Sequence, residues 1–326
     1  MFNKVRQWFF ARTAGPLSRL NEPFYGVVNW LANTIILLFN PERVTKLGNL
    51  HPDKTFYVIR DLPPYAGVAS WYDRVVGYMD RAERKGWIPI VVPPPTAQPD
   101  LGDWYAYFKP LSNIPFQEVN HAQNVVFAVT HGVVYKRYNR RNISRRHELC
   151  KRIIFNDALQ HFIDERFPAL FADMPHPIIG VRFRGTDFRV AGNWRPIGHA
   201  RVPDIKEFCD TIEADCRKWG VDVDGGAHIY LMTEEQEALD AICQRFPRCR
   251  YVVKERFTNF DFKAYLCYKR LNTITPTMNN FMYLLEMYAL SKCDYIIGGY
   301  NGGVLVALNW NGNTYKDVHI LNTGTS

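Results

Sequence analysis

The sequence predicts an α/β protein built from two doubly wound, mostly parallel sheets that face a cleft. Short apolar runs bounded by glycine or proline alternate with helical segments along most of the chain, the pattern of a parallel sheet covered by helices. The length of 326 residues and the apolar share of 47 % suffice for two cores. We place the two domains at 46–170 and 176–326, after a basic and aromatic N-terminal segment at 1–45.

The first domain is predicted from one strand–helix–strand unit. A buried strand, Thr55–Arg60 (TFYVIR), leads into a Pro/Gly loop, Leu62–Gly67. Ser70 is expected to cap a helix that Gly86 ends. Trp87–Val92 (WIPIVV) is then a second strand, which three prolines stop. Such a unit places its two strands in parallel.

The second domain repeats this pattern after the Pro-bearing stretch Phe167–Pro177, which is the predicted boundary. Its expected strands are Ile178–Phe183, His228–Met232, Tyr251–Lys254 and Asp294–Gly298, and its expected helices are Asp204–Trp219, Glu234–Arg245, Asn280–Ser291 and Val304–Trp310. Because ligands of doubly wound sheets bind beyond the carboxyl ends of the strands, the residues after each strand are the candidates for a site.

Arg184, Gly185, Thr186 and Asp187 follow the first strand of the second domain. A guanidinium at this place can bind two diphosphate oxygens and neutralise the charge of a departing diphosphate. Gly185 allows a close backbone approach, and Asp187 can orient Arg184 or accept a hydroxyl proton. The alternative is a purely structural Arg–Asp pair on a loop.

A glycine-bearing turn follows the strand Asp294–Gly298 and precedes the last helix. Its members are Gly299, Tyr300, Asn301, Gly302 and Gly303. Main-chain N–H groups at a turn before a helix form an anion site, although a plain connecting turn uses the same residues.

Thr233, Glu234 and Glu235 follow the strand His228–Met232. Thr233 is a predicted N-cap, and for Glu235 we favour a merely electrostatic effect on the helix N-terminus. Glu286 lies among apolar helix residues, so it needs hydrogen-bond donors if it is buried. The N–H edge of a guanine or a structural partner can supply them.

No metal site is predicted. The motif Asp222-Val223-Asp224 is similar to the metal-binding DxD of some sugar transferases, but it precedes a strand and so lies at the wrong edge of the sheet. The seven cysteines contain no CxxC pair and are expected to be reduced, mostly buried thiols.

Two segments carry much of the formal net charge of +8. The N-terminal segment combines Arg6 with Trp8, Phe9 and Phe10, which suits either an anionic membrane surface or an amphipathic helix packed on its own domain. The run Lys136–Arg152 is either a solvated helix face or a contact for lipid diphosphates or anionic lipid. No nucleic-acid partner is expected, because no aromatic platform accompanies the run.

The ordered motifs of residues 177–312 resemble the superfamily of α1,6-, α1,2- and protein O-fucosyltransferases, with the α1,6 branch and bacterial polysaccharide relatives nearest. The stretch 180–187 (GVRFRGTD) is similar to the family motif G-V-H-x-R-R/G-x-D, and 230–235 (YLMTEE) is similar to Y-L-A-T-D-D. Leu285–Met287 and Leu290–Tyr295 are similar to L-D-I-x-x-L-S-x-A-D-F, and Tyr300–Gly303 stands where the family has F-S-S-Q.

The resemblance implies a GT-B-like pair of Rossmann-type domains and an inverting, metal-independent transfer of fucose from GDP-fucose to a glycan, without a cofactor. It implies Arg184 at the β-phosphate, Glu286 at the guanine, the 301–303 turn at the diphosphate, and Arg182 where a base-contacting histidine usually stands. Among the departures, Gly185 replaces a second arginine of the motif, and Phe188 and Gly192 replace a lysine and an acceptor-side glutamate.

Arg184 and Asp187 are therefore the expected catalytic residues. The expected donor-binding residues are Arg182, Gly185, Thr233, Glu286, Tyr300, Asn301, Gly302 and Gly303, and the acceptor-side candidates are Gly67, Asp73 and Asp103. Asp73 and Asp103 are also reserve candidates for the base. Three alternatives stay open: another nucleotide-sugar donor, a non-catalytic glycan or nucleotide-sugar binder, and a basic peripheral membrane or RNA-binding protein. A cytoplasmic location, with possible docking on the inner membrane face, is expected.

Overall fold

The computed structural model describes residues 34, 37–38, 41–60, 62, 67–92, 103–129, 140–185, 202–223, 226–258, 276–299 and 301–321, without the side chains of 140, 141 and 276. Two predicted site residues, Asp187 and Tyr300, lie outside this part, as do Thr186, Phe188, Gly192 and most of the segment 1–45.

The first sheet has four strands in the order β1-β4-β2-β3. They are β1 (Val44–Thr45), β2 (Leu50–Ile59), β3 (Ile88–Val91) and β4 (Ala122–Phe127). Strand β2 is parallel to β3 and β4, whereas β1 is antiparallel to β4. Helix α3 (Val68–Arg84) connects β2 to β3, so the predicted strand–helix–strand unit is confirmed.

The second sheet has five parallel strands in the order β7-β6-β5-β8-β9. They are β5 (Ile178–Arg182), β6 (His228–Met232), β7 (Cys249–Arg250), β8 (Tyr295–Gly299) and β9 (Asp317–Leu321). In chain order this is 3-2-1-4-5, the Rossmann arrangement. The direction of strand addition therefore reverses between β5 and β8.

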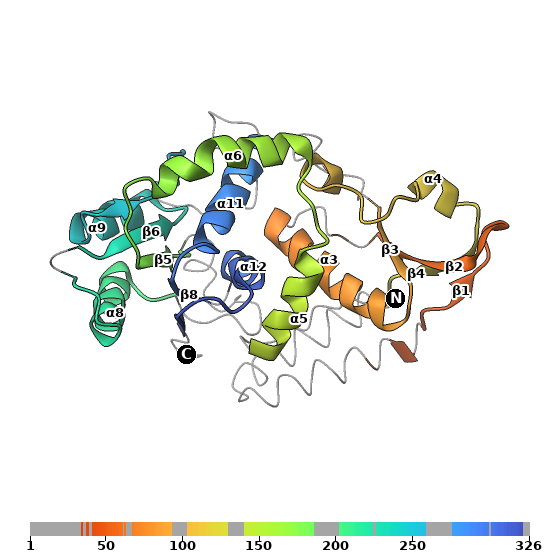
Figure 1. Cartoon of the computed structure of the whole chain (residues 1–326), viewed down its shortest axis with the longest axis horizontal. Coiled ribbons are helices and arrows are strands. Elements are labelled where there is room, and N and C mark those ends of the chain that lie inside the picture. Colours follow the sequence, from red (N-terminus) through yellow and green to blue (C-terminus); the bar gives the residue numbers. More distant parts are fainter. Residues whose placement is uncertain are drawn as a thin grey trace.

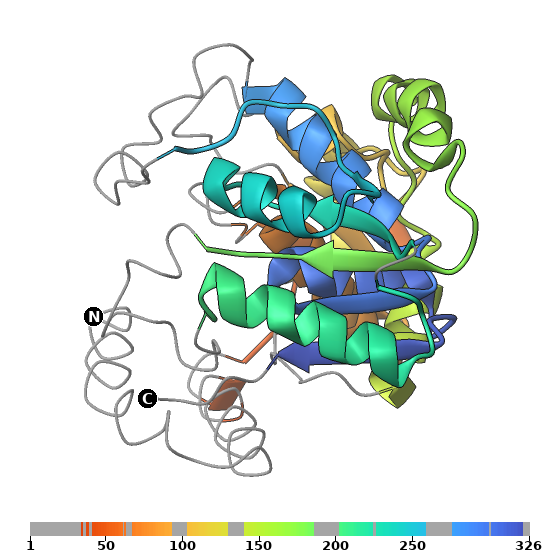
Figure 2. The ribbon, with the colours of Figure 1, turned by 90° about the vertical axis from the view of Figure 1, so that its left-hand side faces the viewer.

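Helices cover both faces of the second sheet (Figure 2). Helices α8 (Ile205–Lys218) and α9 (Gln236–Arg245) lie on one face, and α11 (Pro276–Leu290) and α12 (Gly302–Asn311) lie on the other. Successive side chains of β5 alternate between the faces. Ile179 and Val181 belong to the core under α8 and α9, whereas Ile178 belongs to the core under α11 and α12.

One apolar core joins the two sheets. It contains residues of α3, α11 and α12 together with α5 (Arg140–Cys150) and α6 (Asp157–Phe171). Figure 1 shows α12 and α3 in the middle of the molecule and α6 running across the top. The Trp310 indole donates a 2.7 Å hydrogen bond to the Tyr72 hydroxyl, which ties α12 to α3. The part of the chain before β5 is called the first half below, and the part from β5 onward the second half. Two short elements, η2 (Trp104–Ala106) and α4 (Phe116–Val119), complete the first half.

Several predicted boundaries were wrong. Gly67, not Ser70, is the N-cap of α3, and Glu235, not Thr233, precedes α9. The short strand β7 ends at Arg250, just before the predicted strand Tyr251–Lys254. Pro168 lies inside α6, so this proline of the predicted boundary does not end the helix there.

Candidate anion site between two strand ends

The predicted residues gather where the second sheet changes direction. Arg182, the last residue of β5, is opposite Gly298 of β8 on one side and Met232 of β6 on the other. The chain after β5 and the turn after β8 therefore leave the same edge of the sheet from neighbouring strands. In doubly wound sheets this is the place where ligands bind.

Two arginines share one carboxylate at this edge. Arg182 donates from both terminal nitrogens to Glu234, with 2.8 Å between Nη1 and Oε2. Arg184 donates from Nη1 to Oε1 of the same carboxylate at 2.7 Å. These ion pairs bring the three side chains together beyond the ends of the neighbouring strands β5 and β6. The predicted diphosphate arginine is thus held next to a second guanidinium.

The Glu234 carboxylate is anionic in this arrangement. Burial alone raises the pKa of a carboxyl group, but the charges of Arg182 and Arg184 outweigh burial and hold the pKa of Glu234 far below its usual range. One carboxylate thus neutralises one of the two guanidinium charges. The cluster of these three side chains keeps a net positive charge, which suits an anionic ligand.

The glycine turn begins helix α12 beside this cluster. Asn301 is the N-cap: its Oδ1 accepts from the Val304 N–H at 3.2 Å, and its Nδ2 donates to the Gly299 carbonyl at 2.9 Å. A Cβ added at Gly303 would lie 3.4 Å from Arg182 Nε and 3.1 Å from the Tyr283 hydroxyl. Arg182 Nε is buried and has no hydrogen-bond partner in the described part of the chain. The helix N-terminus and the cluster therefore adjoin.

Close packing at this edge explains two glycines. A Cβ at Gly298 would come within 2.9 Å of Val304 and 3.1 Å of the Arg182 carbonyl oxygen. A Cβ at Gly185 would lie 2.0 Å from Oε1 of Glu235. The position where the family motif allows arginine or glycine is thus filled by the Glu235 carboxyl group, which makes this residue more than a surface charge on α9.

A second buried ion pair lies on α11. Glu286 is 0 % exposed and accepts a 2.6 Å hydrogen bond from Lys254, whose side chain is 4 % exposed. Burial raises the pKa of Glu286 despite this ammonium group. The other oxygen of Glu286, Oε1, has no partner among the described residues. The structure thus supplies the structural partner that the sequence left open, together with one unused acceptor.

The other predicted donor residue, Thr233, is buried at the end of β6. Its hydroxyl accepts from the Glu235 N–H at 3.2 Å, and its carbonyl accepts from Arg256 Nε at 3.2 Å. Thr233 therefore shapes the turn that carries Glu234.

The N-terminus of α3 reaches the site from the other half of the molecule. A Cβ at Gly302 would lie 3.4 Å from the Ala69 side chain. Gly67 caps α3 without a side-chain hydrogen bond, and a Cβ built on it meets nothing within 4 Å. The start of α3 therefore faces the start of α12, and two positive helix ends approach each other.

The two acceptor-side carboxylates have structural partners. Asp73 forms an ion pair with Arg146 that joins α3 to α5. Asp103 caps η2, where its side chain accepts from the N–H groups of Tyr105 at 2.8 Å and Ala106 at 3.2 Å. Neither carboxylate is brought to Arg184 by these contacts.

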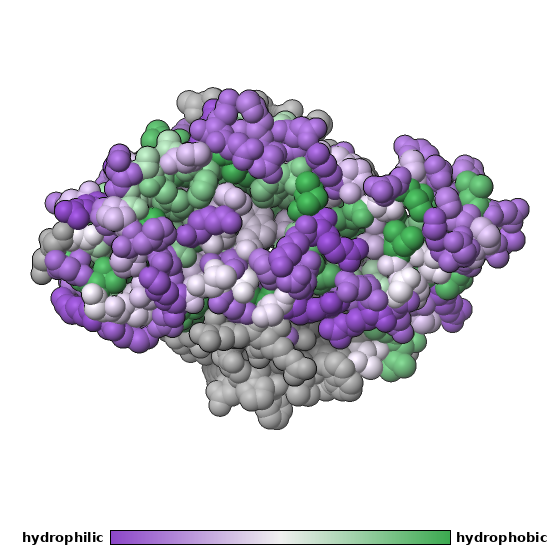
Figure 3. All heavy atoms as spheres, in the orientation of Figure 1, coloured by the Kyte–Doolittle hydropathy of each residue, from purple (hydrophilic) through white to green (hydrophobic). Residues whose placement is uncertain are grey.

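The described basic side chains of the run have acidic partners within the protein. Arg145 pairs with Asp80 at 2.9 Å, and Arg145 and Arg152 both pair with Glu83, at 3.1 and 3.0 Å. The face that carries α5 is hydrophilic (Figure 3). For the described part of the run, the solvated helix face is the interpretation that these contacts favour.

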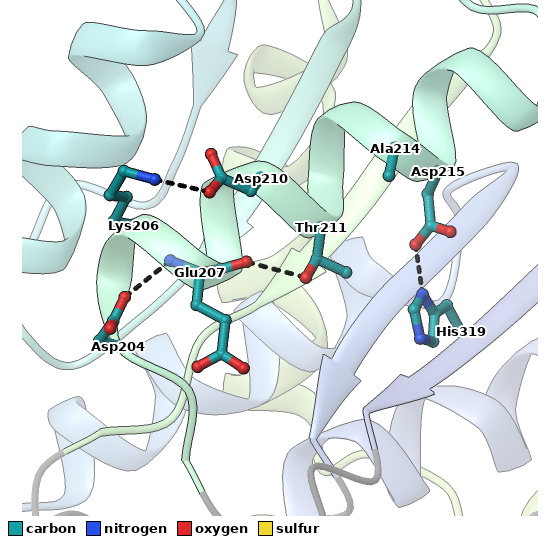
Figure 4. Close-up of a pocket in the computed structure, with 8 residues that line it drawn as sticks. All are labelled: Asp204, Lys206, Glu207, Asp210, Thr211, Ala214, Asp215 and His319. Carbon is teal, nitrogen blue, oxygen red and sulfur yellow. Dashed lines mark hydrogen bonds and ion pairs between the residues drawn. The ribbon is translucent and has the colours of Figure 1, made fainter.

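A separate open hollow of about 440 Å³ lies along α8 and β9 (Figure 4). Its acidic side chains have partners: Asp210 pairs with Lys206 at 2.9 Å, and Asp215 with His319. It contains none of the predicted site residues. In the described part of the chain, three potential His, Cys, Asp or Glu metal ligands do not come together anywhere. The described helices are also too short or too polar to cross a membrane.

Comparison with solved structures identifies the fold. The crystal structure of the α1,6-fucosyltransferase NodZ soaked with GDP-fucose matches with a TM-score of 0.52 and 14 % identity, over 84 % of this chain and 98 % of that chain. The chain has the NodZ fold. NodZ from Bradyrhizobium in another crystal matches with a TM-score of 0.50 and 14 % identity, over 78 % and 92 % of the two chains. POFUT1 matches with a TM-score of 0.49 and 8 % identity, over 82 % and 98 %. Neither a protein-family model nor a curated protein sequence matches.

The NodZ-like fold confirms the predicted α/β, GT-B-like class and the expected likeness to fucosyltransferases. The site also contains residues that the motifs did not single out, above all Glu234, Lys254 and Tyr283. The signal for Glu234 was available: β5 and β6 are parallel, and two residues beyond the Arg182–Met232 register the chain reaches Arg184 and Glu234. Lys254 belongs to a non-strand segment, so no periodicity indicated its contact with Glu286.

Proposed function

We propose that this chain is a glycosyltransferase that transfers fucose from GDP-fucose to a glycan acceptor. The observation that carries the proposal is that Arg184 follows β5 and the glycine turn follows the neighbouring strand β8, at the point where the second sheet changes direction. The NodZ fold supports it, since NodZ was co-crystallised with GDP and soaked with GDP-fucose.

The proposed reaction is an inverting displacement without a metal. The acceptor hydroxyl oxygen forms a bond to the anomeric carbon while the bond from that carbon to the β-phosphate oxygen breaks. The electron pair of the broken bond stays on the diphosphate, where Arg184 and the main-chain N–H groups at the start of α12 stabilise it. The acceptor proton passes to a base, for which Asp187 is our first candidate.

The reserve candidates for the base are weaker, because Asp103 is occupied as a cap and Asp73 as an ion-pair partner of Arg146. Either would have to leave these contacts before it could take up a proton. Asp187 follows Arg184 by three residues in the sequence, and this closeness in sequence is the reason for proposing it first.

A second candidate function is transfer from a nucleotide sugar with a different base. One observation favours it: both positions that the family uses for the guanine are engaged in ion pairs, Arg182 with Glu234 and Glu286 with Lys254. To receive a guanine edge, Glu286 would offer its remaining oxygen or exchange Lys254 for the base.

We propose a lipid-linked or polysaccharide glycan as the acceptor, in bacterial surface-polysaccharide assembly, with the N-terminal segment resting on the anionic inner membrane face. The support is the basic and aromatic composition of that segment, namely Arg6, Trp8, Phe9 and Phe10. Flotation with vesicles of anionic lipid tests this part. Recovery of the protein only in the unbound fraction would remove the membrane from the proposal.

A nucleotide panel with a donor hydrolysis assay tests the donor. GDP at 100 times its dissociation constant should stabilise the protein by about 2.7 kcal/mol, visible as a raised melting temperature, whereas UDP and RNA should have little effect. GDP-fucose should then be hydrolysed slowly in the absence of an acceptor. Stabilisation by UDP or ADP in place of GDP would favour the second candidate, and absence of any nucleotide effect would contradict both.

A further inference from the structure

Arg182 is enclosed by protein. Its side chain is 0 % exposed. Gly298 packs against its Cβ, and Gly303 lies against its Nε. Its Nη1 also donates to the carbonyl of Phe183 at 3.0 Å. These contacts favour a role inside the protein over a direct contact with a base.

The contacts of Arg182 lead to Arg184 through one carboxylate. Arg182 fixes Glu234 by a two-pronged ion pair, a geometry that sets the orientation of both planar groups. Glu234 then accepts from Arg184 Nη1 at 2.7 Å. We infer that Arg182 and Glu234 are positioning residues that hold the Arg184 guanidinium toward the diphosphate, and that Arg182 does not select the base. The inference rests on the proposed function.

The arrangement favours positioning over a purely structural role. Arg184 is the outermost member, with a side chain 18 % exposed, while Arg182 is fully buried behind it. Rotamer freedom of an exposed arginine is large. A fixed acceptor removes much of this freedom before the donor binds, and pre-organised charge is what stabilises a departing anion.

The chain of ion pairs from Arg182 through Glu234 to Arg184, called the relay below, also sets the charge near the ligand. Within this cluster of three side chains, Glu234 compensates one of the two guanidinium groups. Replacing Glu234 by glutamine would leave two cationic groups without their shared counter-ion. Arg184 would then turn away from Arg182, because like charges repel in this partly buried setting.

Glu234→Gln tests the relay by kinetics. The expected result is a fall in kcat on the order of 10²-fold, the size of effect that a misplacement of about 1 Å produces, with a much smaller change in KM for the donor. Glu237→Gln, at an exposed glutamate on helix α9, which follows the turn that carries Glu234, is the matched control and should keep the kcat of the unmodified protein.

The Arg184→Ala background separates positioning from a structural effect. If Glu234 acts only through Arg184, Glu234→Gln has no further effect on kcat once Arg184 is alanine. A structural role lowers kcat by the same factor in both backgrounds, and this result would overturn the inference while leaving the proposed function intact. A protein that binds no nucleoside diphosphate would overturn both.

Arg182→Met combined with Glu234→Gln guards against misfolding of the single variant. Removing both buried charges together should restore the melting temperature that Glu234→Gln loses, yet kcat should stay low. The ratio of the affinities for GDP and ADP should equal that of the unmodified protein. A changed ratio would show that Arg182 contacts the base, and a recovered kcat would show that Arg184 needs no relay.

Discussion

The charged residues of the two halves have different roles. In the second half, Arg182, Arg184 and Glu234 meet at the carboxyl ends of parallel strands, at the edge where ligands bind. In the first half, the sequence also offered Asp73 and Asp103 as site residues. The structure shows that Asp73 joins two helices through Arg146, whereas Asp103 caps η2.

The difference follows from topology. The second sheet is wholly parallel and reverses its order between β5 and β8, so residues distant in sequence reach one edge. In the first half, α3 and α5 lie side by side, and ion pairs between their side chains join them. A carboxylate that follows a strand of the second sheet is therefore a better functional candidate than one on a helix of the first half.

The largest effect should come from the buried pair of the second half. Lys254→Met leaves Glu286 buried without its cation. Such a loss typically lowers the free energy of unfolding by about 3–5 kcal/mol. Because burial already raises the pKa of Glu286, loss of the ammonium group should raise it further, so the folded variant should take up a proton at a higher pH than its unfolded chain does. The deficit should thus be small below the ordinary glutamate pKa of about 4.3 and should grow as pH rises.

Urea unfolding across this pH range measures the deficit. Lys151→Met, which removes an exposed pair with Glu148 on α5, is the control from the first half and should hardly shift the midpoint. A deficit that is equal at all pH values would mean that Glu286 is not the group left unpaired.

Arg184→Ala should be next in size. Loss of one group that stabilises a departing anion costs roughly 10²–10³ in kcat, or about 2.7–4 kcal/mol. The fold should persist because Arg184 is the outermost member of its cluster. Arg217→Ala, at an exposed arginine on α8, is the control in a steady-state donor hydrolysis assay. Full activity of Arg184→Ala would remove the central residue of the proposed site.

Gly67 sharpens the comparison, since it tests whether the first half contributes to the same anion site. Gly67→Asp and Gly67→Asn both place a good N-cap in open space and should stabilise α3 slightly. The added aspartate charge should weaken GDP binding about fivefold, as expected for like charges worth roughly 1 kcal/mol near a surface. Calorimetric titration of both variants with GDP measures this. Equal affinities would place the start of α3 outside the site.

Asp103→Ala should have the smallest effect on activity. Loss of a side-chain cap costs about 1 kcal/mol of stability, but kcat/KM for the folded protein should be unchanged because Asp103 is a structural cap. Asn156→Ala removes the cap of α6 in the same half and should behave alike. A kcat loss confined to Asp103→Ala would return this carboxylate to the list of bases.

The sequence predicted the elements whose pattern is purely local. The strand His228–Met232 was placed to the residue, because it is a continuous apolar run between a glycine-rich turn and acidic residues. Strands β4 and β9 were missed because Gln123, Asn124 and His319 interrupt their apolar runs. Helix α6 was missed because Pro168 indicates a helix end, whereas tertiary packing keeps the helix intact around it.

The candidate site was predictable only in part. Strand ends and parallel pairing are readable from the sequence, and the neighbouring strands β5 and β8 lead Arg184 and the glycine turn away from one edge of the sheet. The roles of these residues stay predictions. Asp187 and Tyr300 stay predictions. Side-chain partners were readable only in part. The parallel register of β5 and β6 brings Arg184 and Glu234 to one edge, but an arginine that stands where a family has histidine does not by itself indicate an ion pair inside the protein.

Helix α12 makes the molecule indivisible. The N-terminus of this helix carries the glycine turn. Its flank contacts α3 through Trp310, and it contacts α5 where His147 lies 2.8 Å from the Asn309 carbonyl oxygen. A fragment starting at residue 176 would expose Leu308 and its neighbours to water. The free-energy cost of this exposure is about 25 cal/mol for each Å² of apolar surface. The second half therefore should not be expressible as an autonomous module, and the whole chain should melt in a single transition.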